Sequence, residues 1–192
     1  MTAHLLLLAH APTAGMRVAA FPRDDEPLEP EAAGCLTALR GKLRHADRYL
    51  VSPAARARET AVALGLKATV APALADCDYG RWRGEPLGEI EQREPQGVAT
   101  WLEDPLAAPH GGESLAALIA RVGAWLDEAA GAHGVTLAIT HGAVVRAAIV
   151  AAIEAPPRAF WRLDVAPLSL TRLSGHDGRW RFAGLSALAA EG

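Results

Sequence analysis

The chain has 192 residues, of which 51% are hydrophobic and 21% charged, and its formal net charge is −3. These values are typical of a globular domain and exclude a disordered chain. No long basic run occurs, so we expect no nucleic-acid partner. No apolar run is long enough to cross a bilayer, and the stretch Leu5–Leu8 follows no Lys or Arg, so we expect a cytoplasmic protein without membrane association.

Short apolar runs alternate with helical patterns along the chain, which indicates an α/β fold: a mostly parallel sheet flanked by helices in a three-layer sandwich. The expected strands are 5–8, 49–51, 68–71, 137–140 and a closing hairpin of 162–173 with 179–182, which turns around 175–178. The expected helices are 31–44, 54–64, 114–132 and 143–153. Ser52 and Pro53 are suited to cap and start the helix 54–64.

The segment 72–113 is rich in Pro and Gly, and we expect it to be irregular. So long a stretch in a compact domain is usually functional. We interpret it as a pocket-wall insertion within a single catalytic domain of residues 1–192. Trp82 and Trp101 lie in it, and each is as well suited to local core as to substrate contact.

Polar side chains follow three of the expected strands. His10 ends the first strand, Ser52 the second and His141 the fourth. The carboxyl ends of parallel strands share one edge of a sheet, where ligands bind in open α/β folds. Arg56 lies near the start of helix 54–64, where a bound anion would offset the unfavourable helix dipole. A guanidinium matches phosphate oxygens, and a neutral imidazole can attack phosphorus, so this set favours phosphoryl chemistry over structural loop histidines.

Five short motifs occur in order between residues 9 and 142. They are AHAPT at 9–13, SPAARARETA at 52–61, LADCDYGRWRG at 74–84, GES at 112–114 and THG at 140–142. Together they resemble the histidine phosphatase superfamily, also called the phosphoglycerate-mutase-like family. The resemblance implies that family's α/β fold and a phosphatase that hydrolyses a small phosphomonoester through a phosphohistidine. It also implies that no metal or other cofactor is needed.

The resemblance implies a role for each matching residue. His10 would be the phosphorylated nucleophile, and His141 would face the phosphoryl group. Arg56 and Thr13 would bind the phosphate. Asp76 stands where the family has its general acid, usually Glu, which would protonate the leaving alkoxide and then help water attack the phosphohistidine.

The main departure from the family is at position 9, where Ala9 replaces an arginine that would bind phosphate. Losing such a charge-assisted contact costs about 1.5–3 kcal/mol. Arg17 is the nearest arginine later in the sequence, and we expect it to fold back over the pocket and replace the missing group. Arg58 and Arg81 are the other candidates.

Two other functions stay open on the sequence. A phosphomutase is disfavoured because the chain is short for one and lacks an evident basic tail to exclude water. A non-catalytic phospho-ligand binder would explain Ala9, but the presence of both His10 and Asp76 favours catalysis. A metal-dependent hydrolase is more remote, because neither His10 nor His141 has a ligand-spaced partner. The partner is then a small phosphorylated metabolite whose identity the sequence does not specify, and a homodimer stays open.

Overall fold

The computed structural model describes residues 2–41, 43, 45–176 and 178–187. They contain a six-stranded sheet of order β3-β2-β4-β1-β5-β6. Its strands are β1 (Ala3–Ala9), β2 (Arg48–Val51), β3 (Thr69–Val70), β4 (Gly134–Thr140), β5 (Ser169–His176) and β6 (Arg179–Ala187). The strands β1 to β4 are parallel, and β5 and β6 pair antiparallel. This sheet confirms the predicted α/β class.

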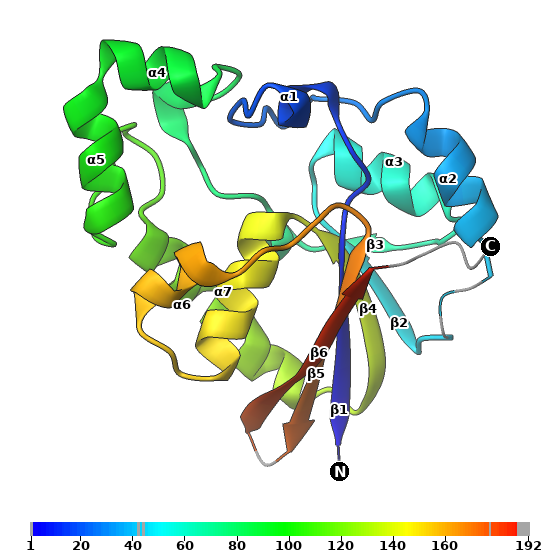
Figure 1. Ribbon diagram of the computed structural model, residues 1–192. Coiled ribbons are helices and arrows are strands. Elements are labelled where there is room, and N and C mark those ends of the chain that lie inside the picture. The colour runs from blue at the N-terminus through cyan, green and yellow to red at the C-terminus, as the bar shows by residue number, and fades with distance from the viewer. Residues whose placement is uncertain (1, 42, 44, 177, 188–192) are drawn as a thin grey trace.

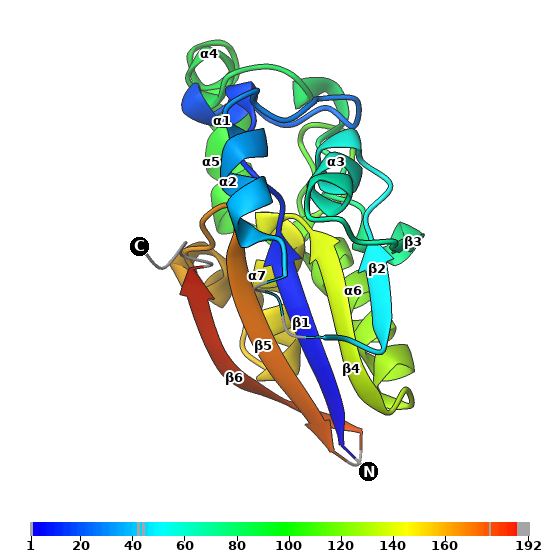
Figure 2. The ribbon, with the colours of Figure 1, turned by 90° about the vertical axis from the view of Figure 1, so that its right-hand side faces the viewer.

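Helices cover both faces of the sheet and the edge where the parallel strands end. They are α1 (Ala14–Arg17), α2 (Ala32–Leu39), α3 (Ala55–Ala63), α4 (Leu87–Arg93), α5 (Pro95–Glu103), α6 (Leu115–Ala130) and α7 (Gly142–Ala152), with the 3₁₀ helices η1 (Pro72–Leu74), η2 (Gly80–Trp82) and η3 (Pro157–Arg162). Figure 1 shows α6 and α7 on one face and α2 and α3 on the other. Figure 2 shows α1 and α4 beyond the carboxyl ends of the strands. The predicted three layers are therefore confirmed.

The central position of β1 follows from its run of leucines. Leu5 and Leu7 pack in the core beneath α6 and α7, whereas Leu6 and Leu8 pack in the core on the side of α2 and α3. A strand covered on both faces needs a continuous apolar run rather than an alternating one. Because its leucines are buried in both clusters, β1 links the two cores. Full burial of each leucine side chain stabilises the folded state by about 1.5–3 kcal/mol.

The segment 72–113 is more regular than expected, because it contains the helices α4 and α5. Pro86 and Pro95 stand at the starts of these helices, where the missing N–H of proline does no harm. Ile90 and Val98 are buried in a small core with Phe21 and Trp82. The prolines that suggested irregular chain therefore start two helices, which form their own core above the sheet.

Other boundaries also differ from expectation, and among them the second hairpin strand runs to Ala187 rather than to 182. The helix expected over 31–44 ends at Leu39, and Gly41 comes soon after it with a left-handed φ of 76°. Its expected end at residue 44 lies outside the described residues. The hairpin begins at Ser169 rather than at 162, because η3 precedes it. The hairpin turn includes residue 177, which is also outside the described part.

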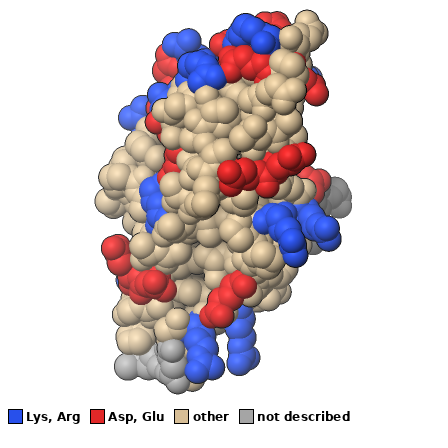
Figure 3. All heavy atoms as spheres, turned by 90° about the vertical axis from the view of Figure 1, so that its left-hand side faces the viewer, with Lys and Arg blue, Asp and Glu red and all other residues tan. Residues whose placement is uncertain are grey.

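The surface gives no single charged field on the face drawn in Figure 3. Basic and acidic side chains alternate there around a largely uncharged centre. The absence of a nucleic-acid partner remains a prediction. Within the described residues, no helix combines the length and apolar character needed to cross a membrane.

Candidate active site

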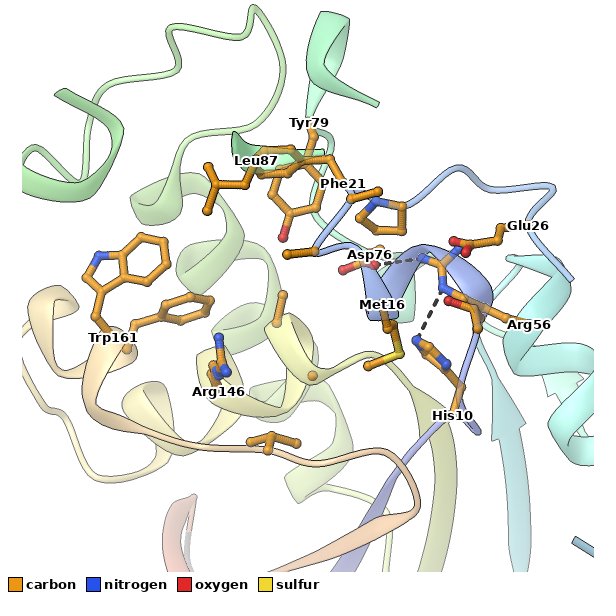
Figure 4. A pocket seen from close by; sticks show the side chains of 18 of the residues that line it. His10, Met16, Phe21, Glu26, Arg56, Asp76, Tyr79, Leu87, Arg146 and Trp161 are labelled. Atoms are coloured by element: carbon orange, nitrogen blue, oxygen red, sulfur yellow. Dashed lines mark hydrogen bonds and ion pairs between the residues drawn. The ribbon is translucent and has the colours of Figure 1, made fainter. Parts of the chain in front are cut away.

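A cavity of about 330 Å³ lies at the carboxyl ends of the parallel strands (Figure 4). Its position follows from register, because Ala9 pairs with Thr140 and Val51 pairs with Ile139. The residues that come next, His10, His141 and Ser52, therefore emerge side by side. The volume suits a small molecule. Its lining includes His10, Thr13, Phe21, Glu26, Arg56, Asp76, Tyr79, Trp101, Arg146, Phe160 and Trp161.

The imidazole of His10 is held in one orientation. Its Nδ1 lies 2.7 Å from the carbonyl oxygen of Ala11, so Nδ1–H donates and Nε2 carries the lone pair. Arg56 Nε–H donates to that Nε2 at 3.2 Å. Burial and then the Arg56 charge lower the pKa of His10 below its usual value. The ring is therefore neutral at neutral pH, which is the form that can act as a nucleophile.

The guanidinium of Arg56 is the central cation of the site. It is 1% exposed, yet it sits in the first turn of α3. Besides His10, it donates to Asp76 Oδ2 at 2.7 Å and to the Arg23 carbonyl at 2.6 Å. Figure 4 shows it between His10 and Asp76. The structure therefore brings Arg56 to the strand edge, as the helix position suggested.

Ser52 does not cap α3, because that helix begins at Ala55 with Ala54 in the capping position. The Ser52 hydroxyl instead lies 2.6 Å from His141 Nε2, and it accepts the Ala54 N–H at 3.3 Å. Burial lowers the pKa of His141 to about 3, so this ring is also neutral. A hydroxyl that donates to Nε2 leaves Nδ1 protonated. The Ser-Pro motif carried no signal for this contact.

Asp76 lies beside both Arg56 and His141. Its Oδ2 bonds Arg56 and lies 3.3 Å from His141 Nδ1, while Oδ1 accepts the Cys77 N–H at 2.9 Å. Burial alone would raise the pKa of Asp76, but the Nδ1–H of His141 and the positive charge of Arg56 both favour the carboxylate and leave that pKa below its usual value. Asp76 is therefore an ion-paired carboxylate in the free protein.

The Arg121 side chain fixes the segment that leads to Asp76, a role the sequence did not reveal. Arg121 reaches from α6 and forms a bidentate pair with Glu113, with distances of 2.9 and 2.8 Å. The same guanidinium donates to the carbonyls of Ala73 and Ala75 at 2.7 and 3.1 Å. It therefore holds the backbone before Asp76 and the GES motif together.

The third and fourth motifs also meet through their backbones. Glu113 N–H donates to the Asp78 carbonyl at 2.7 Å. A Cβ on Gly112 would lie 2.0 Å from that carbonyl oxygen, and Gly80 has a left-handed φ of 48°. Both positions need glycine, because another side chain would force the two loops apart.

Thr13 lines the cavity as expected, whereas Arg17 lies outside it. Thr13 is buried and lines the cavity. The side chain of Arg17 is 71% exposed and pairs with Glu29, with Nη2 2.8 Å from Oε2, outside the cavity lining. Arg58 is exposed, and Arg81 pairs with Glu94. The expectation that Arg17 replaces the arginine missing at position 9 is therefore wrong for this structure, because α1 turns its guanidinium outward to a nearer carboxylate.

The aromatic side chains divide between core and cavity. Trp82 is fully buried in the small core with Ile90 and does not line the cavity, whereas Trp101 does. Arg146 also lines the cavity. It lies only four residues beyond the THG motif, but no role was expected of it.

The sequence of this chain matches a known family along almost its whole length. Residues 5–187 match the model of the histidine phosphatase superfamily (branch 1). The chain belongs to the histidine phosphatase superfamily. The predicted family is therefore confirmed. Among the described residues, no group of three or more His, Cys, Asp and Glu side chains is placed to hold a metal ion, and independence of metals stays a prediction.

Curated relatives in this superfamily include named phosphatases. A bifunctional protein of Mycobacterium tuberculosis is 34% identical over 62% of this chain and 35% of its own length. Glucosyl-3-phosphoglycerate phosphatase of Mycobacterium tuberculosis is 33% identical over 63% of this chain and 61% of its length. Phosphoserine phosphatase 1 of Hydrogenobacter thermophilus is 29% identical over 61% of this chain and 59% of its length. The matches thus span one third to three fifths of these relatives.

Solved structures share the fold over almost the entire chain. A mycobacterial glucosyl-3-phosphoglycerate phosphatase has a TM-score of 0.85 at 26% identity, covering 97% of this chain and 100% of its own. A phosphoserine phosphatase of Entamoeba histolytica has a TM-score of 0.87, covering 98% of this chain and 99% of its own, at 16% identity. The second likeness is one of fold alone.

Proposed function

We propose that this protein is a metal-independent phosphatase that hydrolyses a small phosphomonoester through a phosphohistidine on His10. The observation that carries the proposal is the orientation of His10, whose Nδ1 lies 2.7 Å from the Ala11 carbonyl oxygen and whose Nε2 accepts the Arg56 Nε–H at the cavity. Asp76 and His141 stand beside the same guanidinium. A nucleophile, a proton donor and a phosphate-binding cation thus surround one small space.

The first chemical step in this proposal transfers the phosphoryl group to His10. The Arg56 Nε–H that bonds Nε2 in the free protein turns to the bound phosphate and frees the lone pair of Nε2. Nε2 then attacks phosphorus, the bond from phosphorus to the ester oxygen breaks, and Asp76 in its protonated form gives a proton to the leaving alkoxide. In the second step, water attacks phosphorus while the Asp76 carboxylate takes a proton from it. Phosphate leaves, and His10 returns to its neutral form. Arg56 and His141 would hold the phosphoryl oxygens through both steps.

Asp76 must gain a proton before the first step, and the substrate itself can cause this. In the free protein, Asp76 holds Arg56 at 2.7 Å. A phosphate dianion would compete for that guanidinium and place negative charge near Asp76. Both changes raise the pKa of a carboxyl group. Substrate binding would thus convert Asp76 from an ion-pair partner into an acid.

The substrate is proposed to be a small phosphorylated metabolite. The cavity of about 330 Å³ supports a small organic group attached to the phosphate. The names of relatives, glucosyl-3-phosphoglycerate phosphatase and phosphoserine phosphatase, support the same class.

The test is a panel of phosphomonoesters, assayed in EDTA by release of inorganic phosphate. We expect turnover by the wild type and none by His10→Ala. His4→Ala is the matched control, since His4 is an exposed histidine on β1, the strand that precedes His10. Quenching with alkaline detergent during turnover should trap a phosphoryl adduct in the wild type only, and that adduct should be stable in base and lost in acid.

Several outcomes would contradict the proposal. Activity that survives in His10→Ala would exclude the phosphohistidine, and activity lost in EDTA but restored by a divalent ion would indicate a metal hydrolase. Phosphate binding without turnover on any ester would indicate a binder. Transfer of the phosphoryl group to a second metabolite, rather than its release, would indicate a mutase.

A further inference from the structure

A second cation faces the cavity and has no role in the chemistry proposed above. Arg146 projects from α7, and Figure 4 shows its guanidinium pointing into the cavity, on the other side from Arg56. Its Nε is buried and has no hydrogen-bond partner among the residues that the structure describes. Arg56 already donates hydrogen bonds to Asp76, His10 and a backbone carbonyl. Of the two arginines that line the cavity, Arg146 is therefore the one whose Nε–H is available to a ligand.

The surroundings of Arg146 are aromatic. Its Cζ lies 5.6 Å from the centre of the Phe160 ring, and Trp161 packs against Phe160 with ring centres 5.0 Å apart. Trp101 and Phe21 continue this wall, with ring centres 5.5 Å apart. Such a wall excludes water and strengthens any charge interaction made beside it.

Tyr79 adds a hydroxyl to the same region. Figure 4 shows its phenol oxygen pointing into the cavity, toward the side that holds Arg146. Burial raises the pKa of Tyr79 well above its usual value, so the phenol keeps its proton and can donate a hydrogen bond. A planar cation and a phenol donor therefore face one space, which aromatic rings enclose.

We propose that Arg146 and Tyr79 form a subsite for a carboxylate carried by the organic part of the substrate. The inference rests on the proposed function and narrows it: the substrates are phosphomonoesters of carboxylic acids. One guanidinium matches the charge of one carboxylate, and its paired N–H groups match the two oxygens in geometry. A second phosphate group would bring up to two charges to a single cation.

The same arginine would act differently if it compensated for Ala9. Ala9 packs in the core cluster that includes Phe160 and Val165, and both of these line the cavity with Arg146. An arginine that served the phosphoryl group would improve the binding of every phosphate ligand equally. An arginine that bound a carboxylate would improve the binding of only those phosphate ligands that carry one. The experiment tests this difference.

The experiment uses two phosphonates that have no ester bond to hydrolyse. One is benzylphosphonate with a carboxymethyl group in the para position, and the other is its carboxamide. Isothermal titration calorimetry gives the dissociation constant of each. We expect the wild type to bind the carboxylate about 10- to 100-fold more tightly than the amide, as for one desolvated charge-assisted contact.

Arg146→Met should abolish that preference while leaving the affinity for the amide within about twofold of wild type. Arg146→Lys keeps the charge without the planar fork and should retain part of the preference. Tyr79→Phe should reduce it by a smaller factor. Arg158→Met is the matched control, because Arg158 is an exposed arginine on η3 outside this cavity, and it should keep the full preference.

Two results would overturn the subsite. One is equal wild-type affinity for both phosphonates. The other is a loss in Arg146→Met that is equal for both, which would assign Arg146 to the phosphoryl group. Circular dichroism shows whether Arg146→Met is folded. If it is not, the subsite would also be overturned when the single variants Arg146→Lys and Tyr79→Phe both keep the full preference for the carboxylate. Binding does not depend on turnover, so a carboxylate preference without hydrolysis would refute only the proposed function.

Discussion

Replacing Asp76 by asparagine should have two opposite effects on this protein. The substitution keeps the shape of the side chain but removes its negative charge and its proton. In the free protein, Asp76 Oδ2 accepts from Arg56 at 2.7 Å, with side chains 8% and 1% exposed. The amide therefore holds Arg56 less strongly, so the guanidinium is freer to bind phosphate. The amide also cannot protonate a leaving group.

The sizes of both effects can be worked out from this geometry. A hydrogen bond to a charged group contributes about 1.5–3 kcal/mol and a neutral one about 0.5–1.5 kcal/mol. The difference, about 1–1.5 kcal/mol, corresponds to inorganic phosphate binding about 5- to 12-fold more tightly in Asp76→Asn. Loss of a general acid should slow hydrolysis about 10²- to 10⁴-fold for an alkyl phosphate. The loss should be much smaller for 4-nitrophenyl phosphate, whose leaving group departs without a proton.

Calorimetry with inorganic phosphate and kcat on the two substrate types measure both effects. Asp78→Asn is the control, because Asp78 is 49% exposed and pairs with Arg83 outside the cavity. It should change neither quantity. Weaker phosphate binding in Asp76→Asn, together with equal losses on alkyl and aryl substrates, would refute the reasoning and assign Asp76 a structural role.

Three further predictions test the arrangement of the site. Arg17→Ala should leave the affinity for inorganic phosphate within about twofold of wild type, because Arg17 pairs with Glu29 outside the cavity. A tenfold loss of affinity, measured by calorimetry, would show that Arg17 does bind the phosphate. Ser52→Ala removes the hydroxyl 2.6 Å from His141 Nε2 and should destabilise the fold by about 1–3 kcal/mol in urea; an unchanged midpoint would contradict that contact. The pKa of His141 is lowered to about 3 from 6.5, so the folded state resists protonation that the unfolded chain accepts, and stability falls as pH decreases below 6.5. The loss should reach about 2 kcal/mol by pH 5, and His141→Gln should reduce this slope in urea titrations; an equal slope in both proteins would refute it.

The sequence by itself determined the fold class and the edge where the site lies. The continuous leucine run predicted a strand at 5–8, and the structure places that strand, β1, in the interior of the sheet between β4 and β5. Strand-end residues of a parallel sheet share one edge, and the structure indeed brings His10, His141 and Arg56 together there. The five motifs added Asp76, whose loop position carried no periodic signal. The chemical roles of these residues remain predictions.

The tertiary structure decided which groups pair with which. Ser52 is 89 residues from His141, and Arg121 is 45 or more residues from the carbonyls that it holds. Ser52 was expected to cap a helix, and Arg17 was expected to replace the arginine missing at position 9, but Ser52 contacts His141 and Arg17 pairs with Glu29. Arg146 stands close to the THG motif in the sequence, but only the structure shows that it lines the cavity and that its Nε has no hydrogen-bond partner among the described residues. Sequence periodicity reports which face of an element is buried, whereas a hydrogen bond depends on distances between elements that only the packed chain sets.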